Sequence, residues 1–287
     1  MDITVSDALR RRCDSVPGAP SWLAQLPACL NELMGRWDLT LGSPLGGEEG
    51  SCSWVHAVTR RDGTDAVLKL GLPHLEAEQE GDALQFWDGG PAVRLFEQDV
   101  ALGALLLERC VPGTPLRAQP EAEQDRVIAG LLRRLWRSPP AHAFRPLSGM
   151  LEHWIARKQV SQPLVADCGL VRQGLSLFEE LPKSARVQVL LATDLHAGNV
   201  LAARRQEWLV IDPKPFVGDP AYDATQHLLN CAARLRTDAE RTIHGFAELL
   251  NVDPERVRLW TFARLAAESH AGGDWPDAAN IARALAV

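Results

Sequence analysis

The stretch "LLATDLHAGNVLAARRQEWLVIDPKP", residues 190–215, decides how the rest of the chain is interpreted. Two short apolar runs in it each end in an aspartate, Asp194 and Asp212, and Asn199 lies in the loop between them. Neighbouring carboxylates both stay ionised only with a cation close by. Magnesium holding a nucleotide phosphate meets that need, because it prefers hard oxygen ligands. The stretch therefore predicts a phosphoryl-transfer site, in which Asp194 accepts the substrate hydroxyl proton and Asn199 and Asp212 hold the metal.

Other interpretations of these residues stay open. Kinases often carry a histidine two residues before the first aspartate, and this chain has Ala192 there. A pseudokinase, which binds a nucleotide or ligand but has lost catalysis, is therefore one alternative. A metal hydrolase that uses Asp194, His196 and Asp212 is a weaker one. A single histidine in a loop is more typical of a structural residue, so we expect His196 to hold a backbone group.

Further upstream, Lys69 ends the apolar run "DAVLKL" of a predicted strand. An exposed strand lysine is the common case, and the alternative is a phosphate-binding lysine held by a carboxylate. In the helix predicted next, Glu76 and Glu80 share a face with Leu84, whereas Glu78 points elsewhere. A glutamate on an inward face needs a cation. We expect Glu80 to pair with Lys69, with Glu76 as the second choice.

Hydrophobic periodicity divides the chain into two parts. Residues 37–110 predict a strand, a Gly-rich turn, two strands around an Asp-Gly hairpin, a helix and two more strands. After the Pro-rich residues 111–120 the chain is mainly helical. Two strand-like segments that end at Asp194 and Asp212 interrupt the helices, and their pairing would bring the two carboxylates together. The fold class is α+β and bilobal, with a small antiparallel β-sheet lobe (residues 1–110) and a helical lobe (residues 111–287).

Two segments of the first lobe are candidates for nucleotide contacts. "GGEEGSCS", residues 46–53, can fold over phosphates and offer backbone N–H groups with the hydroxyl of Ser51 or Ser53. Its glutamates would repel phosphate, so the signal is weak by itself. From its position at the end of the lobe, the backbone from Glu108 to Cys110 is expected to bind adenine.

Composition limits the classes of function. The net charge of −7 argues against nucleic acid as a partner, because phosphate contacts need a basic face. The 46% hydrophobic content is enough for a packed core. No pair of the six cysteines has the C-x-x-C spacing of zinc or redox sites. Scattered thiols of this kind are typical of proteins in a reducing cytoplasm. The N-terminal sequence lacks an apolar signal region and no run is long enough to span a membrane, so we expect a soluble, cytoplasmic protein. Nothing in the sequence indicates an oligomeric state.

Near the C-terminus and after the second aspartate, other acidic residues have two interpretations. Trp275, with Glu268, Asp274 and Asp277, forms either an acidic aromatic mouth for a cationic substrate or an ordinary turn. Asp219 and Asp223 are predicted to be structural. Asp219 is expected to cap a turn, and Asp223 to cap a helix or to brace the catalytic loop.

Several motifs in order along residues 45–230 are familiar: "AVLKL", "EAEQEGDALQFWDG", "LLLERCVPGTPL", "DLHAGNVL" and "WLVIDPKPFVGDPAYD". With them the chain resembles the aminoglycoside phosphotransferase family, which has a protein-kinase-like fold. It is most similar to the branch with streptomycin 6-phosphotransferases and hydroxyurea phosphotransferases. The resemblance implies an ATP- and Mg²⁺-dependent enzyme that phosphorylates a hydroxyl of a small molecule and confers antibiotic resistance.

By position, the resemblance assigns the catalytic aspartate to Asp194, the magnesium ligands to Asn199 and Asp212, and the phosphate-binding lysine and its partner to Lys69 and Glu80. The chain departs from the family pattern in two places. Residues 192–194 are Ala-Thr-Asp where the family has His-Gly-Asp. Residues 212–214 are Asp-Pro-Lys where protein kinases have Asp-Phe-Gly. The missing histidine is a scaffold residue in related kinases, so we expect Thr193 or His196 to supply the lost hydrogen bond.

Overall fold

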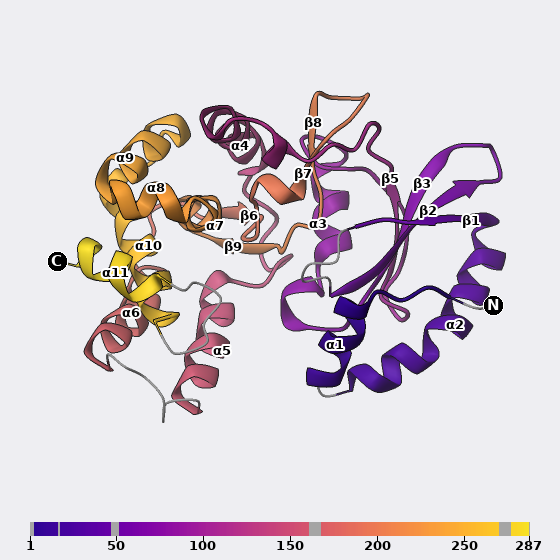
Figure 1. The fold of residues 1–287 in the computed structure, drawn as a ribbon, viewed down its shortest axis with the longest axis horizontal. Coiled ribbons are helices and arrows are strands. Elements are labelled where there is room, and N and C mark those ends of the chain that lie inside the picture. The colour runs from indigo at the N-terminus through magenta and orange to yellow at the C-terminus, as the bar shows by residue number, and fades with distance from the viewer. Residues whose placement is uncertain (1–2, 17, 47–51, 161–167, 270–276, 287) are drawn as a thin grey trace. The chain divides into compact units, whose positions relative to one another are not determined.

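The structure is a computed structural model that describes residues 3–16, 18–46, 52–160, 168–269 and 277–286. It divides into two compact units (Figure 1). The first unit contains Met1–Gly113 together with Ala203–Leu209, and the second contains Thr114–Ala202 and Val210–Val287. One internal segment of the chain therefore returns to the first unit after the second has begun.

The first unit is a five-stranded antiparallel sheet with helices. Its strand order is β1-β2-β3-β5-β4. The Asp-Gly hairpin between β2 and β3 forms as predicted, because Gly63 adopts a positive φ of 80° and Asp62 accepts a hydrogen bond from the backbone N–H of Thr64. The elements are α1 (Asp7–Ser15), α2 (Ala19–Arg36), β1 (Leu39–Pro44), β2 (Ser53–Arg60), β3 (Asp65–Gly71), α3 (Glu80–Trp87), β4 (Leu95–Asp99) and β5 (Ala104–Glu108).

The core of the first unit lies on one face of this sheet. Leucines of α1 and α2 pack there against sheet residues that include Leu68 and Leu70 of β3. Because successive side chains of a strand point to opposite faces, Lys69 between these two leucines points to the other face. Figure 1 shows α3 and α2 on opposite sides of the sheet. The strand pattern therefore directs Lys69 away from the leucine core.

One predicted helix of the first unit is shorter than the sequence pattern indicates. A 3₁₀ turn covers Leu75–Ala77, and the α-helix begins only at Glu80, because the backbone of Gln79 (φ −112°, ψ 18°) is not helical. Glu76 and Glu80 thus do not lie on one continuous helix. The expectation that Glu76 shares a helix face with Leu84 is wrong, whereas Glu80 and Leu84 are both buried in α3, four residues apart.

The second unit is mainly helical, with short strands. Its helices are α4 (Glu121–Leu135), α5 (Leu147–Val160), α6 (Cys168–Glu180), α7 (Pro220–Asn230), α8 (Ala232–Thr237), α9 (Ala239–Leu250), α10 (Pro254–Ala267) and α11 (Ala278–Leu285). Its short strands are β6 (Val189–Leu191), β7 (Val200–Ala202), β8 (Trp208–Val210, which begins in the returning segment) and β9 (Phe216–Gly218). Short 3₁₀ turns at Leu116–Ala118 and Ala197–Asn199 pack against each other.

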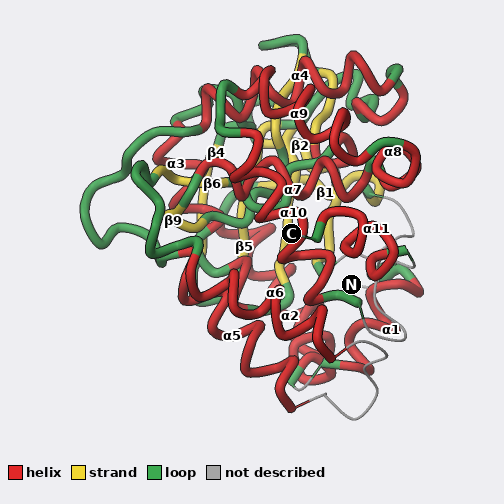
Figure 2. Tube along the Cα trace, turned by 90° about the vertical axis from the view of Figure 1, so that its left-hand side faces the viewer, coloured by secondary structure: helices red, strands yellow, loops and turns green. Residues whose placement is uncertain are grey.

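Helix α10 organises the packing of the second unit. It contacts α6, α7, α9 and α11, which are grouped around it in Figures 1 and 2. Trp260 and Val257 on it are completely buried. Gly174 lets α6 approach closely, since a Cβ atom there would lie 2.8 Å from the Cβ of Ala266. These contacts build a helical core that supports α7.

The two strand-like runs that end in aspartate do not pair with each other. Strand β6, just before Asp194, pairs antiparallel with β9 in the register Leu190↔Val217. The pairing that would have joined the two runs therefore does not form, although the run before Asp212 does form β8. The α+β fold class with an antiparallel sheet and a helical part is confirmed.

Candidate active site

Lys69 and Glu80 form a buried ion pair in the first unit. The ammonium nitrogen of Lys69 lies 2.6 Å and 2.5 Å from the two carboxylate oxygens of Glu80, and both side chains are at least nine-tenths buried. A buried lysine is stable only with such a partner. Glu80 is the first residue of α3, where the helix dipole also favours a negative charge. The pair is the one that the sequence predicts, with Glu80 rather than Glu76.

The remaining residues of the first unit that are predicted to bind nucleotide are Ser51, Ser53 and the backbone from Glu108 to Cys110. Ser51 lies outside the described residues, and Ser53 is the first residue of β2, opposite Gly71. Burial raises the pKa of the Cys110 thiol to about 12, so this thiol stays protonated. The backbone N–H of Glu108 donates to the carbonyl of Arg94 (2.8 Å). A contact between residues 108–110 and adenine stays a prediction.

Arg205 is a structural residue that the sequence analysis missed. It belongs to the segment that returns to the first unit, and its guanidinium contacts both carboxylate oxygens of Glu108 (2.8–3.1 Å). It also donates to the carbonyl of Ala92 (2.8 Å) and to that of Gly89. Burial acts to raise the pKa of the Glu108 carboxyl, but the Arg205 guanidinium and the N–H of Arg94 outweigh it and hold this pKa below its usual range. Arg205 thus fixes the end of β5 to the turn after α3.

In the second unit, Asp223 holds the backbone just before Asp194. One of its carboxylate oxygens accepts from the N–H of Thr193 (2.7 Å), and the other accepts from the N–H of Ala192 (3.0 Å) and from the Trp136 indole (2.9 Å). Asp223 is 1% exposed, and burial raises its pKa to about 6 against the effect of these three donors. It is therefore a brace of this loop, one of the two structural roles that the sequence indicates.

Thr193 ties the same loop to the segment after Asp212. Its hydroxyl donates to the carbonyl of Lys214 (2.6 Å), and the N–H of Lys214 donates to the carbonyl of Ala192 (2.8 Å). Thr193 has a positive φ of 45°, and so does Asp212 (53°). Residues other than glycine rarely adopt this conformation, which costs about 1–3 kcal/mol and is common at functional sites. Thr193 and His196 are the candidates to replace the hydrogen bond of the missing histidine. Thr193 is the one that bonds the loop before Asp194 to the segment after Asp212.

His196 has a local structural role. Its Nδ1 accepts a hydrogen bond from the N–H of Gly198 (3.1 Å) and so shapes the turn that precedes Asn199. Burial, helped by the nearby positive charge of Arg117, lowers the pKa of His196 to about 4. The imidazole is therefore neutral near pH 7, which agrees with the expectation that it holds a backbone group.

Asn199 and Asp212 offer a set of oxygen donors that fits magnesium. The Asn199 side-chain amide donates through Nδ2 to the carbonyl of Asp194 (3.0 Å), so its oxygen faces another direction. The N–H of Ile211 donates to the carbonyl of Asn199 (2.9 Å), which places the two candidate ligands on adjoining backbone. An amide oxygen and a carboxylate are ligands that magnesium accepts.

Lys214 lies next to both aspartates of this set. Its ammonium nitrogen is 2.8 Å from Oδ1 of Asp212 and 3.9 Å from Oδ2 of Asp194. The structure thus brings Asp194, Asn199 and Asp212 together as predicted, and it adds a cation. In the sequence, Lys214 was visible only as a departure from the Asp-Phe-Gly pattern.

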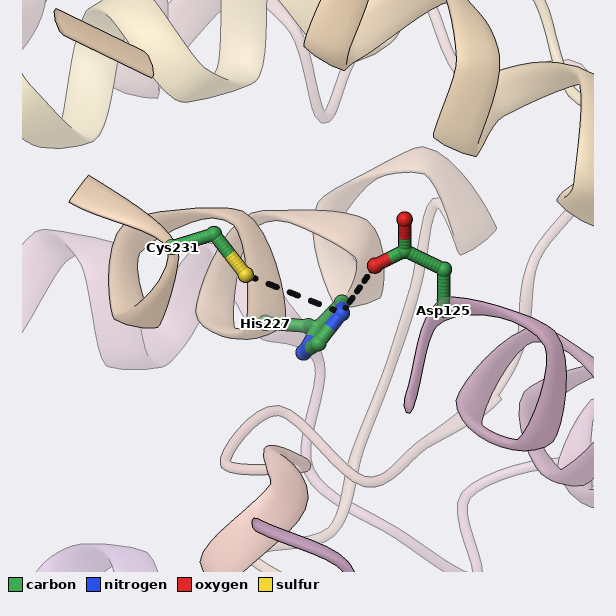
Figure 3. Close-up of side chains that lie close together, drawn as sticks. All are labelled: Asp125, His227 and Cys231. Carbon is green, nitrogen blue, oxygen red and sulfur yellow. Dashed lines mark hydrogen bonds and ion pairs between the residues drawn. The ribbon is translucent and has the colours of Figure 1, made fainter. Parts of the chain in front are cut away.

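A second cluster of titratable groups lies between α7 and α4, where His227 and Cys231 face Asp125 (Figure 3). Nε2 of His227 is 2.7 Å from Asp125 and 3.9 Å from the thiol of Cys231. Arg234 donates to both oxygens of Asp125 (2.9 and 2.8 Å). The bonds from His227 and Arg234 hold the pKa of Asp125 low although burial opposes them, and burial raises the pKa of Cys231 to about 11. Because the guanidinium already balances the carboxylate, this cluster joins α4, α7 and α8 rather than offering a metal site.

Asp219 begins helix α7. It accepts from the N–H of Ala221 (3.0 Å), from the buried indole of Trp260 (2.7 Å) and from Arg256. It is therefore a cap and a link to α10, in line with its predicted structural role. Asp274 and Trp275, from the proposed acidic mouth, lie outside the described residues.

A buried lysine–glutamate pair on a five-stranded sheet, an aspartate loop with an asparagine and a second aspartate in a helical unit define a small-molecule kinase of the protein-kinase-like fold. A protein-family model described as "Aminoglycoside/hydroxyurea antibiotic resistance kinase" matches residues 36–274, and the chain belongs to this family.

Curated relatives agree with this assignment. The chain is 35% identical over 255 residues to streptomycin 6-kinase of Streptomyces glaucescens, covering 85% of this chain and 82% of the relative. It is also 35% identical over 246 residues to hydroxyurea phosphotransferase of Kitasatospora aureofaciens, covering 84% of this chain and 71% of the relative.

Solved structures support the fold. Choline kinase LicA from Streptococcus pneumoniae aligns with a TM-score of 0.61 at 12% identity, covering 91% of this chain and 97% of that one. LicA in complex with AMP aligns with a TM-score of 0.64 at 14% identity, covering 89% and 94%. Among the described residues, no helix has the length and apolar character needed to cross a bilayer.

Proposed function

We propose that this kinase transfers the γ-phosphoryl group of ATP, with Mg²⁺, to a hydroxyl of a small antibiotic-like molecule. The observation that carries the proposal is the link between the three residues: the Asn199 side chain donates to the Asp194 carbonyl, and the Asn199 carbonyl accepts from the N–H of Ile211, next to Asp212. The relatives named for streptomycin and hydroxyurea make these two molecules the first acceptors to test.

The residues divide the work by position and charge. Lys69, held by Glu80, is the donor for nucleotide phosphate oxygens. Asp194 orients the acceptor hydroxyl and takes its proton as the phosphoryl group is transferred. Asn199 and Asp212 would hold magnesium, which when bound neutralises charge on the phosphates and orients the transferred group. Phosphoryl transfer needs little covalent help, so this positioning supplies most of the catalysis.

The test is a Mg-ATP consumption assay with streptomycin, hydroxyurea and other hydroxylated antibiotics. Asp194→Asn should leave ATP binding intact and lower turnover by about 100-fold or more. Lys69→Ala should instead raise the KM for ATP or weaken ATP binding. Near-wild-type turnover of the Asp194→Asn protein would contradict the assignment. ATP-dependent thermal stabilisation without transfer to any acceptor would favour a pseudokinase, and Mg²⁺-dependent hydrolysis without nucleotide would favour a metal hydrolase.

A further inference from the structure

Arg205 lies on the part of the chain that runs between the two predicted magnesium ligands. The segment Ala203–Leu209 belongs to the first unit, although the residues before and after it belong to the second. It begins four residues after Asn199 and ends three residues before Asp212. Because an extended chain spans at most about 3.6 Å per residue, each ligand is tied to this segment by a tether of at most about 15 Å.

The loop that contains this segment is closed at its base in the second unit. The N–H of Ile211 donates to the carbonyl of Asn199 (2.9 Å), so the two ends of the loop lie side by side. Asp212 follows Ile211 directly. The loop therefore has both predicted magnesium ligands at its base and Arg205 within it, and whatever fixes Arg205 also restrains the two ligands.

In the first unit, Arg205 contacts both elements that hold the Lys69–Glu80 pair. Its guanidinium binds both carboxylate oxygens of Glu108 at the end of β5 (2.8–3.1 Å), and it donates to the carbonyl of Ala92 in the turn after α3 (2.8 Å). Strand β5 pairs with β3, the strand of Lys69, and α3 begins at Glu80. One guanidinium thus joins the strand next to the lysine to the helix that carries the glutamate.

The bond between Arg205 and Glu108 is strong and shielded from water. The side chains of the two residues are only 19% and 16% exposed. Charge-assisted bonds in which a guanidinium binds both oxygens of a carboxylate are shorter and stronger than neutral ones, and they also fix the geometry. A lysine, with its single ammonium group, cannot bind the carboxylate and the carbonyls after α3 in the same way. Arg205 therefore holds α3 and β5 in one arrangement.

We propose that Arg205 is a positioning residue that couples the binding of magnesium to the binding of the nucleotide. The phosphates of one ATP molecule can engage Lys69 and a magnesium ion held by Asn199 and Asp212 together only if these groups keep a fixed separation. Two contacts with one ligand strengthen each other when the protein holds them in place beforehand. Arg205 supplies this constraint, because it connects the loop of the two ligands to the strand and the helix of the ion pair. The inference rests on the proposed function, since it concerns how the same site binds Mg-ATP.

The test measures the dissociation constant of the non-hydrolysable analogue β,γ-imido-ATP by isothermal titration calorimetry, once with Mg²⁺ and once with EDTA. The ratio of the two constants is the magnesium enhancement. Arg205→Lys should lower this enhancement by about tenfold and change the constant in EDTA by less than about twofold. Arg204→Lys, which changes the exposed arginine next to it, is the matched control and should keep the wild-type enhancement. Chelation of Mg²⁺ by the free nucleotide is the same for every protein, so it cancels in the comparison.

A second comparison separates this coupling from a general loss of stability. When Lys69 is already replaced by alanine, adding Arg205→Lys should lower the enhancement by less than about twofold, because one of the two groups that Arg205 aligns is missing. A tenfold loss in this background as well would overturn the inference, because the effect would then not pass through Lys69. So would a wild-type enhancement in Arg205→Lys, or a wild type that binds the analogue equally with Mg²⁺ and with EDTA.

The kinase function itself is tested separately by the same titrations. Failure of wild type to bind the analogue in either condition would refute the proposed function, whereas an unchanged enhancement in Arg205→Lys leaves it standing. If Arg205→Lys does not fold, Glu108→Gln weakens the same bond from its other side and should show the same loss of enhancement. A wild-type enhancement in Glu108→Gln would then overturn the inference.

Discussion

Replacing Asp223 with asparagine should separate the stability of this kinase from its activity. The buried carboxylate accepts three N–H donors, from Thr193, Ala192 and Trp136. Asparagine has the same shape but offers one acceptor oxygen, and its amide nitrogen must face a donor. We expect the oxygen to keep the two partners of Oδ2, so that the N–H of Thr193 faces the new NH₂ group.

The expected free-energy change is the difference of two similar quantities. A pKa raised from 3.8 to about 6 means that keeping the carboxylate ionised costs about 3 kcal/mol, which asparagine avoids. That pKa already includes the bonds from the three donors to the carboxylate, so the opposing cost is the lost bond and the donor that faces a donor, together about 3 kcal/mol. Above pH 7 the Asp223→Asn protein should therefore unfold with a free energy within about 1.5 kcal/mol of wild type. Asp223→Ala, which leaves all three donors without an acceptor, should lose about 3 kcal/mol or more.

Activity should not follow stability. Release of the Thr193 N–H disturbs the residue next to Asp194, and a small misplacement of a reacting group costs about 10- to 100-fold in turnover. The assay is urea unfolding together with kcat per folded molecule. Asp219→Asn is the matched control, because Asp219 is also a buried aspartate of α7 that accepts a tryptophan N–H but does not touch residues 192–194. Wild-type kcat in Asp223→Asn, or an equal loss in Asp219→Asn, would refute the reasoning.

Three further predictions concern other parts of the molecule. Arg205→Ala should destabilise the first unit by about 2–4 kcal/mol in urea unfolding, because the Glu108 carboxylate loses its cation and keeps only the N–H of Arg94, and the carbonyls of Gly89 and Ala92 lose their guanidinium donor. Arg205→Lys should not restore the loss, since lysine cannot bridge these groups, and wild-type stability in either variant would contradict this. The pKa of His196 is lowered to about 4, below its unfolded value near 6.5, so its contribution to stability is present above pH 6.5 and is lost as the pH falls toward 4. Between pH 7.5 and 5, wild type should therefore lose about 1–2 kcal/mol relative to His196→Asn, and parallel pH profiles would show that the histidine is not neutralised by the fold. In the cluster of Asp125, His227 and Cys231, Arg234→Met should lower the free energy of unfolding by about 3 kcal/mol, whereas Cys231→Ser should change it by less than about 1 kcal/mol. Neither EDTA nor zinc should shift the wild-type melting temperature. A rise of this temperature with zinc would instead indicate a metal site.

Much of this architecture follows from local sequence patterns. The run around Lys69 and the acidic helix after it favour an ion pair with Glu80, with an exposed lysine and a pair with Glu76 as the alternatives. The Asp-Gly turn between β2 and β3 carries its own signal, because glycine tolerates the positive φ found at Gly63. In these places a few neighbouring residues determine the structure, so the sequence suffices.

Other features depend on contacts between distant segments. From sequence Asp223 could be either a helix cap or a brace of the catalytic loop, and only the fold shows that it accepts hydrogen bonds from residues 192 and 193 across the unit. Arg205 lies in a polar loop with no pattern, and only its return to the first unit brings it to Glu108. The pairing of β6 with β9 rather than with β8 could not be read from two short apolar runs of similar character. Such contacts are set by the packing of whole elements, which local propensity does not encode.

The alanine at position 192 is best understood through its backbone. Its side chain is completely buried, its N–H donates to Asp223, and its carbonyl accepts from the N–H of Lys214. The resemblance implies a bracing histidine at this position in related kinases, whereas here the Thr193 hydroxyl donates to the Lys214 carbonyl, next to the bond between the Lys214 N–H and the Ala192 carbonyl. Residues 192 and 193 are thus held at four groups, which are both of their N–H groups, the Ala192 carbonyl and the Thr193 hydroxyl, without any imidazole at residue 192. The alanine at residue 192 therefore leaves the backbone before Asp194 held, and by itself it is no evidence for a pseudokinase.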